Sequence, residues 1–184
     1  KYIDRFKSIG YKNIILGQWH VNLSLFPPKP EKKKFDVSFC GQLSGDRAVS
    51  IEYLKTNGID IERFHGLEYT EMLKGLSESF VGINFSKNYN GRPPQTQMKL
   101  RMFEVPAANS LLFTEYHEGI EDYFEIDKEI VCFKTPSEML EKMKVFLKNK
   151  NIVENIAAKG HIRFRRNHES CVRLKKILQE IEKI

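Results

Sequence analysis

The chain has 184 residues, of which 41% are hydrophobic, so it can build one well-buried domain and is neither disordered nor of low complexity. Its apolar runs are far shorter than the roughly 20 residues that span a membrane, and no secretory leader is recognisable. The net charge of +6 favours an anionic partner, such as a nucleotide phosphate, a nucleic acid or an anionic membrane surface.

Three cysteines, Cys40, Cys132 and Cys171, are odd in number and far apart in the chain. This spacing argues against a disulfide framework and against a thiolate metal site. We expect buried thiols in a reducing compartment, and therefore a soluble, cytoplasmic protein.

The first part of the chain ends in a linker. An amphipathic helix is predicted from Tyr2 to Gly10, and "NIILGQW" (13–19) has the composition of a strand. The proline-rich stretch and charge run "LFPPKPEKKK" (25–34) follow, where a domain boundary is expected. We place that boundary after residue 28 and interpret the lysines that follow as a solvated segment.

Residues 29–184 are predicted to form an α/β domain. Five short apolar segments alternate with helical segments of about ten residues, which favours right-handed βαβ units and a parallel sheet covered on both faces. The predicted strands are "FDVSFCG", "IDIERFHG", "FVGINFS", "SLLFTE" and "EIVCF". From Pro136 onward the chain is predicted to be helical, with apolar stripes that we expect to be core contacts: Leu140, Met143, Phe146 and Leu147, then Leu174, Ile177, Leu178 and Ile181.

A parallel sheet binds ligands at the carboxyl ends of its strands, so the loops there are the candidate site. Three loops can line one cleft: "CGQLSGDR", "FHGLEY" and "KNYNGRPPQTQMKLR". In the first loop, Gly41 and Gly45 permit close approach of the backbone, and Arg47 can bind a phosphate through its guanidinium. A plain tight turn explains the glycines equally well.

The stretch "KLRMFEVPAANSLLFTE" (99–115) begins as a charged helix and ends as an apolar strand. Lys99 and Arg101 favour an anion, and Glu104 can accept hydrogen bonds from two sugar hydroxyls. The alternative is an ordinary ion pair on a solvated helix face. Two histidines also have alternative interpretations. His65 can stack near a nucleobase or be a turn residue, and His168 is expected to be a structural contact rather than a metal ligand or a base.

The ordered series of these motifs resembles the C-terminal half of GT-B glycosyltransferases of the CgeB-like, group 1 type. The matching elements are the R-x-F-E pattern at Arg101, Phe103 and Glu104, the small residues after it, and a late H-x-x-x-x-R pair at His168 and Arg173. The glycine loop "DVSFCGQLSGDR" and the linker "WHVNLSLFPP" are also similar to parts of this family.

The resemblance implies a Rossmann-like parallel sheet flanked by helices, with a helical C-terminal extension. It implies that residues 1–28 are the end of an N-terminal domain and the interdomain linker, and that residues 29–184 bind a nucleotide sugar. Glu104 would hold the ribose, and the stretch from Gln97 to Arg101, with Lys99, would face the diphosphate together with the loop of Gly41 and Arg47. Thr96 stands where the family carries the first glutamate of its E-x7-E element, and Asn109 replaces a glycine.

The expected activity is transfer of a sugar from a nucleotide-diphosphate sugar to a hydroxyl of an acceptor, either a glycan, a protein or a lipid. By resemblance the catalytic residues lie mainly in a preceding domain, so the fragment alone is expected to be inactive, and neither a cofactor nor a metal is expected. The alternative is a non-catalytic module that binds a nucleotide or a polyanion on the same fold. Nucleic acid binding through "HIRFRRNH" (161–168) is not favoured, because no recognition pattern accompanies the charge. A peripheral membrane contact remains compatible with the positive charge.

Overall fold

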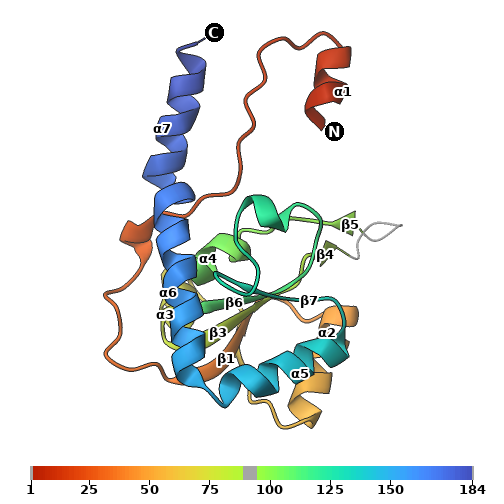
Figure 1. Cartoon of the computed structure of the whole chain (residues 1–184), viewed down its shortest axis with the longest axis vertical. Helices are drawn as coiled ribbons and strands as arrows, with labels where there is room; N and C mark the ends of the chain where they lie inside the picture. Colours follow the sequence, from red (N-terminus) through yellow and green to blue (C-terminus); the bar gives the residue numbers. More distant parts are fainter. Residues whose placement is uncertain (1, 89–94, 184) are drawn as a thin grey trace.

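The computed structural model describes residues 2–88 and 95–183. Its centre is a five-stranded parallel sheet with the strand order β2-β1-β3-β6-β7 (Figure 1). The strands are β1 (Phe35–Cys40), β2 (Glu62–Phe64), β3 (Ser79–Asn84), β6 (Leu111–Glu115) and β7 (Val131–Phe133). The five predicted strands and the α/β fold class are therefore confirmed.

Successive residues of each strand face opposite sides of the sheet, as the period of two requires. In β6, Leu111 and Phe113 belong to one hydrophobic cluster and Leu112 to the other. In β7 the same division separates Val131 and Phe133 from Cys132. Both faces are apolar, which is why these segments appear in the sequence as continuous hydrophobic runs.

Helices cover both faces of the sheet. One face packs against α2 (Asp46–Thr56), α5 (Pro136–Leu147) and the first turns of α6 (Lys150–Asn167). The other face packs against α3 (Tyr69–Ser77), α4 (Arg101–Ala107) and the later part of α6. The helix α4 lies very close to β3, because a Cβ atom at Gly82 would stand 2.7 Å from the side chain of Val105.

The segment before the sheet contains α1 (Tyr2–Ser8), an extended stretch and the short 3-10 helix η1 (Leu23–Leu25). The expected strand over 13–19 does not form, since these residues pair with no strand of the described chain. Trp19 in that stretch is 56% exposed. The chain joins the main body at Val21, whose carbonyl accepts a hydrogen bond from the amide of Ser170. The division at residue 28 stays a prediction.

From the sequence, the lysine-rich linker is predicted to be solvated. This prediction is wrong for Lys33. The Lys33 ammonium donates to the carbonyl oxygens of Ser77, Ser79 and Asn109 at 2.8–3.2 Å, and it contacts the Ser110 hydroxyl at 2.9 Å. Two of these carbonyls lie at the carboxyl ends of α3 and α4, where the helix dipole favours a cation. Lys33 therefore binds the linker to the underside of the domain.

The last helix, α7 (Ser170–Ile181), continues from α6 past the sheet (Figure 1). The expected core role of its apolar stripe is wrong for this chain, because Leu174, Leu178 and Ile181 are all exposed, Leu178 by 58%. The earlier stripe on α5 does form core, with Leu140 and Met143 buried.

The remaining elements are short: the 3-10 helix η2 (Ile120–Asp122) and an antiparallel pair, β4 (Lys87–Asn88) and β5 (Gln95–Thr96). Within the described part of the chain, no helix combines the length and apolar character needed to cross a bilayer.

Candidate functional site

The strand order changes direction between β1 and β3, because the chain passes from β1 outward to β2 and then returns to the other side of β1. Ligands of open α/β sheets bind in the crevice at the carboxyl ends of the strands at such a switch point. A cavity of about 300 Å³ lies at this position. It is lined by the ends of the two strands and by residues of α2 and α4: Phe39, Cys40, Ile83, Asn84, Phe85, Arg47, Lys99, Leu100, Arg101 and Glu104.

Two cations line the cavity without an ion-pair partner among the described residues. The Arg47 Nη1 atom donates to the carbonyl of Gln42 at 3.2 Å, whereas its Nε is buried without a hydrogen-bond partner in the described structure. The Lys99 ammonium donates to the carbonyl of Lys87 at 3.1 Å. Burial, and then the charge of Arg47, lower the pKa of Lys99. Both cations line the same cavity, which favours an anionic ligand.

Glu104 supplies the one carboxylate of the cavity lining and is only 2% exposed. Arg101 lies 2.7 Å from its Oε2 atom, and the hydroxyl of Tyr69 donates to the carboxylate. Burial, and then the Glu104 charge, raise the pKa of Tyr69, so the hydroxyl keeps its proton. A carboxylate can accept about four hydrogen bonds, so further donors can still bind here. The ion pair that the alternative expected is therefore present, but it does not lie on a solvated face, because the Glu104 carboxylate is buried.

A second buried carboxylate holds the loop that follows β3. The Glu115 Oε2 atom accepts from the backbone amides of Ser86 and Lys87 at 3.1 and 3.0 Å, and its Oε1 lies 2.6 Å from the Lys87 ammonium. The carbonyl oxygen of Lys87 in turn accepts a hydrogen bond from the Lys99 ammonium. Glu115 therefore positions one of the cations of the cavity through the backbone.

A family model described as glycosyl transferase-like matches residues 26–179. The chain belongs to this family. No curated protein sequence matches it. Among solved structures, TarM from S. aureus, crystallised with UDP and other ligands, superimposes with a TM-score of 0.67 at 14% identity, over 97% of this chain and 41% of TarM.

Two further structures share the fold of this glycosyl transferase-like chain. The C-terminal domain of the glycosyl transferase group 1 family protein LpcC from Francisella tularensis has a TM-score of 0.63 at 10% identity, over 82% of this chain and 99% of that one. Sucrose-phosphate synthase from Thermosynechococcus elongatus has a TM-score of 0.65 at 10% identity, over 98% of this chain and 56% of that one. The fold is therefore that of the C-terminal, Rossmann-like domain of GT-B glycosyltransferases, and the chain spans about half of the longer relatives or less.

The structure brings together four of the residues that the sequence proposed for this glycosyl transferase-like site: Arg47, Lys99, Arg101 and Glu104. Gly41 lies directly after the lining residue Cys40, and its φ of 131° is one that glycine adopts far more readily than other residues. The loop after β1 thus has a backbone that favours glycine, but Gly41 does not itself line the cavity, and its role toward a diphosphate stays a prediction.

Two other proposed residues lie outside the cavity lining. His65 is exposed in the turn after β2, and the side chain of Gln97 is exposed as well. The backbone amide of Gln97 donates to the carbonyl of Ser86 at 2.8 Å. Part of the third predicted loop, 89–94, lies outside the described residues.

Sequence reasoning missed Tyr69, Asn84 and Glu115. Tyr69 is the last residue of the quoted loop "FHGLEY", so the second loop does reach the site, but through its tyrosine and not through its histidine. Asn84 is the last residue of β3 and donates to the Thr114 hydroxyl at 2.9 Å. Its place at a strand end was the available signal.

The cysteines and His168 form no cluster of metal ligands in the described part of the chain. Cys40 and Cys132 are buried free thiols, and burial raises their pKa to about 11 and about 12, whereas Cys171 is exposed, contrary to expectation. His168 packs against the ring of Phe103 at 5.0 Å, as expected for a structural contact. Among the described residues, no three histidine, cysteine, aspartate or glutamate side chains converge as metal ligands.

Proposed function

We propose that this chain is the donor-binding half of an enzyme that transfers a sugar from a nucleotide-diphosphate sugar to an acceptor hydroxyl. The observation that carries the proposal is the cavity at the switch point, which combines a buried carboxylate, Glu104, with the cations Arg47 and Lys99. In a nucleoside diphosphate, the cations suit the negatively charged diphosphate, and the carboxylate suits the hydroxyl groups of the ribose.

In this proposal each group of the cavity has one task. Arg47 and Lys99 bind the diphosphate and stabilise the negative charge that develops when it leaves the sugar. Glu104, oriented by Arg101 and Tyr69, accepts hydrogen bonds from the two ribose hydroxyls. Since the cations neutralise the leaving group, we propose that donor binding needs no metal, and that a chelator leaves the affinity unchanged.

The acceptor pocket and the catalytic base are proposed to lie mainly in the part of the enzyme that precedes this domain. The chain covers 41% of TarM, so it is expected to bind donor without transferring sugar. The three free cysteines support a cytoplasmic location. The acceptor is a glycan, a protein or a lipid with a free hydroxyl.

The test compares ribose with deoxyribose ligands. The chain is titrated calorimetrically with UDP and GDP and with their 2′-deoxy forms. Because an acceptor left without its donor costs about 1–3 kcal/mol, we expect the preferred nucleotide to bind about 5- to 150-fold more tightly than its deoxy form. Glu104→Gln should reduce this ratio, with circular dichroism confirming the fold.

Equal affinity for the ribo and deoxy forms in the wild type would remove Glu104 from the ribose site and contradict the proposal. The alternative, a binding module without turnover, is motivated by the exposed Thr96 at the position of the first family glutamate. It predicts the same binding but no hydrolysis or transfer of a UDP sugar by the full-length protein. An assay for released UDP separates the two.

A further inference from the structure

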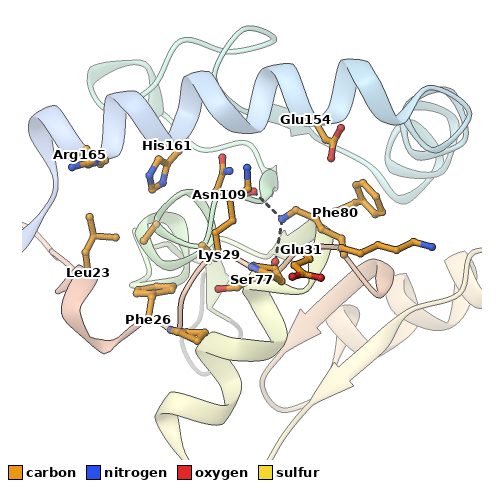
Figure 2. A pocket seen from close by; sticks show the side chains of 16 residues that line it. Leu23, Phe26, Lys29, Glu31, Ser77, Phe80, Asn109, Glu154, His161 and Arg165 are labelled. Carbon is orange, nitrogen blue, oxygen red and sulfur yellow. Dashed lines mark hydrogen bonds between the residues drawn. The ribbon is translucent and has the colours of Figure 1, made fainter.

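A second cavity, of about 420 Å³, lies at the opposite end of α4 from the candidate donor site. It is enclosed by the linker, by the carboxyl ends of α3 and α4, and by α6, which passes above it in Figure 2. A cavity of this volume falls in the range that small ligands occupy. None of its lining residues belongs to the donor cavity.

Part of the inner surface of this linker cavity is apolar. Leu23, Phe26 and Pro27 of the linker face Ala107 and Ala108 at the end of α4, with Phe80 at the far side. Lys33 also lines it, but its ammonium contacts four oxygen acceptors and so has no free proton for a ligand. Lys33 therefore forms part of the cavity wall, and its ammonium is not available to bind an anion.

Cations stand at one end of the linker cavity. Lys29 and Arg165 are exposed and have no hydrogen-bond or ion-pair partner in the described part of the chain. His161 lies between Arg165 and Lys29 in Figure 2, and its Nδ1 contacts the carbonyl of Pro106 at 2.8 Å. Burial lowers the pKa of His161, and the charges of Arg165 and Lys29 add to this effect. Lys29, His161 and Arg165 thus line the same cavity.

The opposite charges lie elsewhere in the cavity. Figure 2 shows Glu154 near Phe80, at the end away from Arg165, and Glu31 beside Ser77. In the described part of the chain, no ion pair joins either carboxylate to Lys29 or Arg165. The cationic end, next to Leu23 and Phe26, thus offers an anion site beside an apolar surface.

We propose that the linker cavity binds a small amphiphilic anion, with an alkyl or aromatic group against Leu23 and Phe26 and a phosphate or carboxylate on Lys29 and Arg165. The apolar group of the ligand would be removed from contact with water, which favours binding. The anionic group would accept charge-assisted hydrogen bonds from Lys29 and Arg165. Such a ligand contacts the linker and α6 together. The inference is independent of the donor site.

The probe is hexyl phosphate, titrated calorimetrically into the 184-residue chain, with hexanol and inorganic phosphate as half-ligands. We expect one binding site for hexyl phosphate and at least about tenfold weaker binding of each half-ligand, since each lacks one class of contact. Lys29→Glu and Arg165→Glu should each weaken hexyl phosphate at least about tenfold. Lys144→Glu, an equal charge change on the exposed side of α5, should not, and UDP affinity should stay the same in all three variants.

A second arm distinguishes the source of the ligand. If the protein binds free hexyl phosphate and both charge reversals weaken this binding, the ligand is a soluble molecule. If the protein instead sediments only with phosphatidylglycerol vesicles, and Lys29→Glu and Arg165→Glu abolish the sedimentation, the ligand is a lipid with an anionic headgroup. The proposal is overturned if neither probe binds, if both charge reversals leave binding unchanged, or if Lys144→Glu weakens it equally. Thermal unfolding of each variant shows that it is folded.

Discussion

Arg47 illustrates how a single residue joins a local motif to a site assembled from distant parts of the chain. Its backbone is placed by the first turn of α2, directly after β1, and its guanidinium lies 6.0 Å from the centroid of the Phe39 ring. An Nε atom that is buried and unpaired carries a desolvation cost which an anionic ligand can offset. The same cavity contains Lys99 from the start of α4, more than fifty residues later.

Replacing Arg47 by alanine should therefore weaken nucleoside diphosphate binding by about 1.5–3 kcal/mol, or about 10- to 150-fold, the usual size for a hydrogen bond to a charged group. Calorimetric titration with UDP or GDP measures the loss. Lys55→Ala, which removes a cation from the last turn of the same helix, is the control and should leave affinity unchanged. An unaltered affinity in Arg47→Ala would reduce the glycine loop to a simple turn.

At the scale of elements, α6 contributes to both faces of the sheet. Its first turns place Val153 and Ile156 in one hydrophobic cluster, and its later turns place Phe164 in the other. Between them, Gly160 faces the chain just before β7, where a Cβ atom would collide with the carbonyl oxygen of Glu129. Phe164 lies in "HIRFRRNH" and is fully buried, so its own ring is not available for stacking on a nucleobase.

Gly160→Ala should lower the free energy of unfolding by up to about 2 kcal/mol. Moving the backbone of Glu129 to admit the methyl group costs about 1–3 kcal/mol, and the helix propensity of alanine offsets about 1 kcal/mol of it. Urea unfolding measures the change. Gly17→Ala is the matched control, since nothing lies within 4 Å of the position where its Cβ would stand. Equal stability of the two variants would show that α6 can shift freely.

At the scale of the whole molecule, His168 holds together parts of the chain that are far apart. Its Nδ1 accepts from the Gln18 amide of the linker at 2.7 Å, and its Nε2 donates to the carbonyl of Tyr123 at 3.1 Å. Phe103 of α4 and Phe124 pack against its ring. These contacts suit a neutral imidazole. Burial, and after it the charge of Arg173, lower the pKa of His168 to about 4.

This pKa predicts a loss of stability in mild acid. Between pH 6.5 and pH 4 the unfolded chain binds a proton at His168 that the folded protein does not, so the free energy of unfolding falls as the pH falls. The full effect of this group is at most about 3 kcal/mol and is complete below pH 4. Urea unfolding at pH 7, 5.5 and 4 measures it.

The variant His168→Gln separates this effect from the titration of carboxylates, because it keeps a hydrogen-bonding side chain without the ionisable group. The stability advantage of the wild type over this variant should shrink between pH 7 and pH 4. A difference that stays constant over that range would mean that His168 has the same pKa in the folded and unfolded states.

The core elements and their types can be predicted from the sequence. Five short apolar segments alternate with helical segments, and this pattern predicts five parallel strands. Local signals such as Gly58 after α2 and Pro136 at the start of α5 predict where helices end or begin. The residues Arg47 and Glu104 were also recognisable, because they stand directly after strands or at a helix start. These features depend on neighbours within a few residues, so a single sequence contains them.

The tertiary structure alone decided what those elements do together. The order β2-β1-β3-β6-β7 places the crevice between β1 and β3, so Tyr69 reaches Glu104 while His65 does not. Likewise, α7 has the apolar stripe of a core helix yet extends past the sheet, and one linker lysine, Lys33, contacts four oxygen atoms of the domain. The physical reason is that burial and charge pairing arise from contacts between segments distant in the chain, which periodicity and composition do not specify.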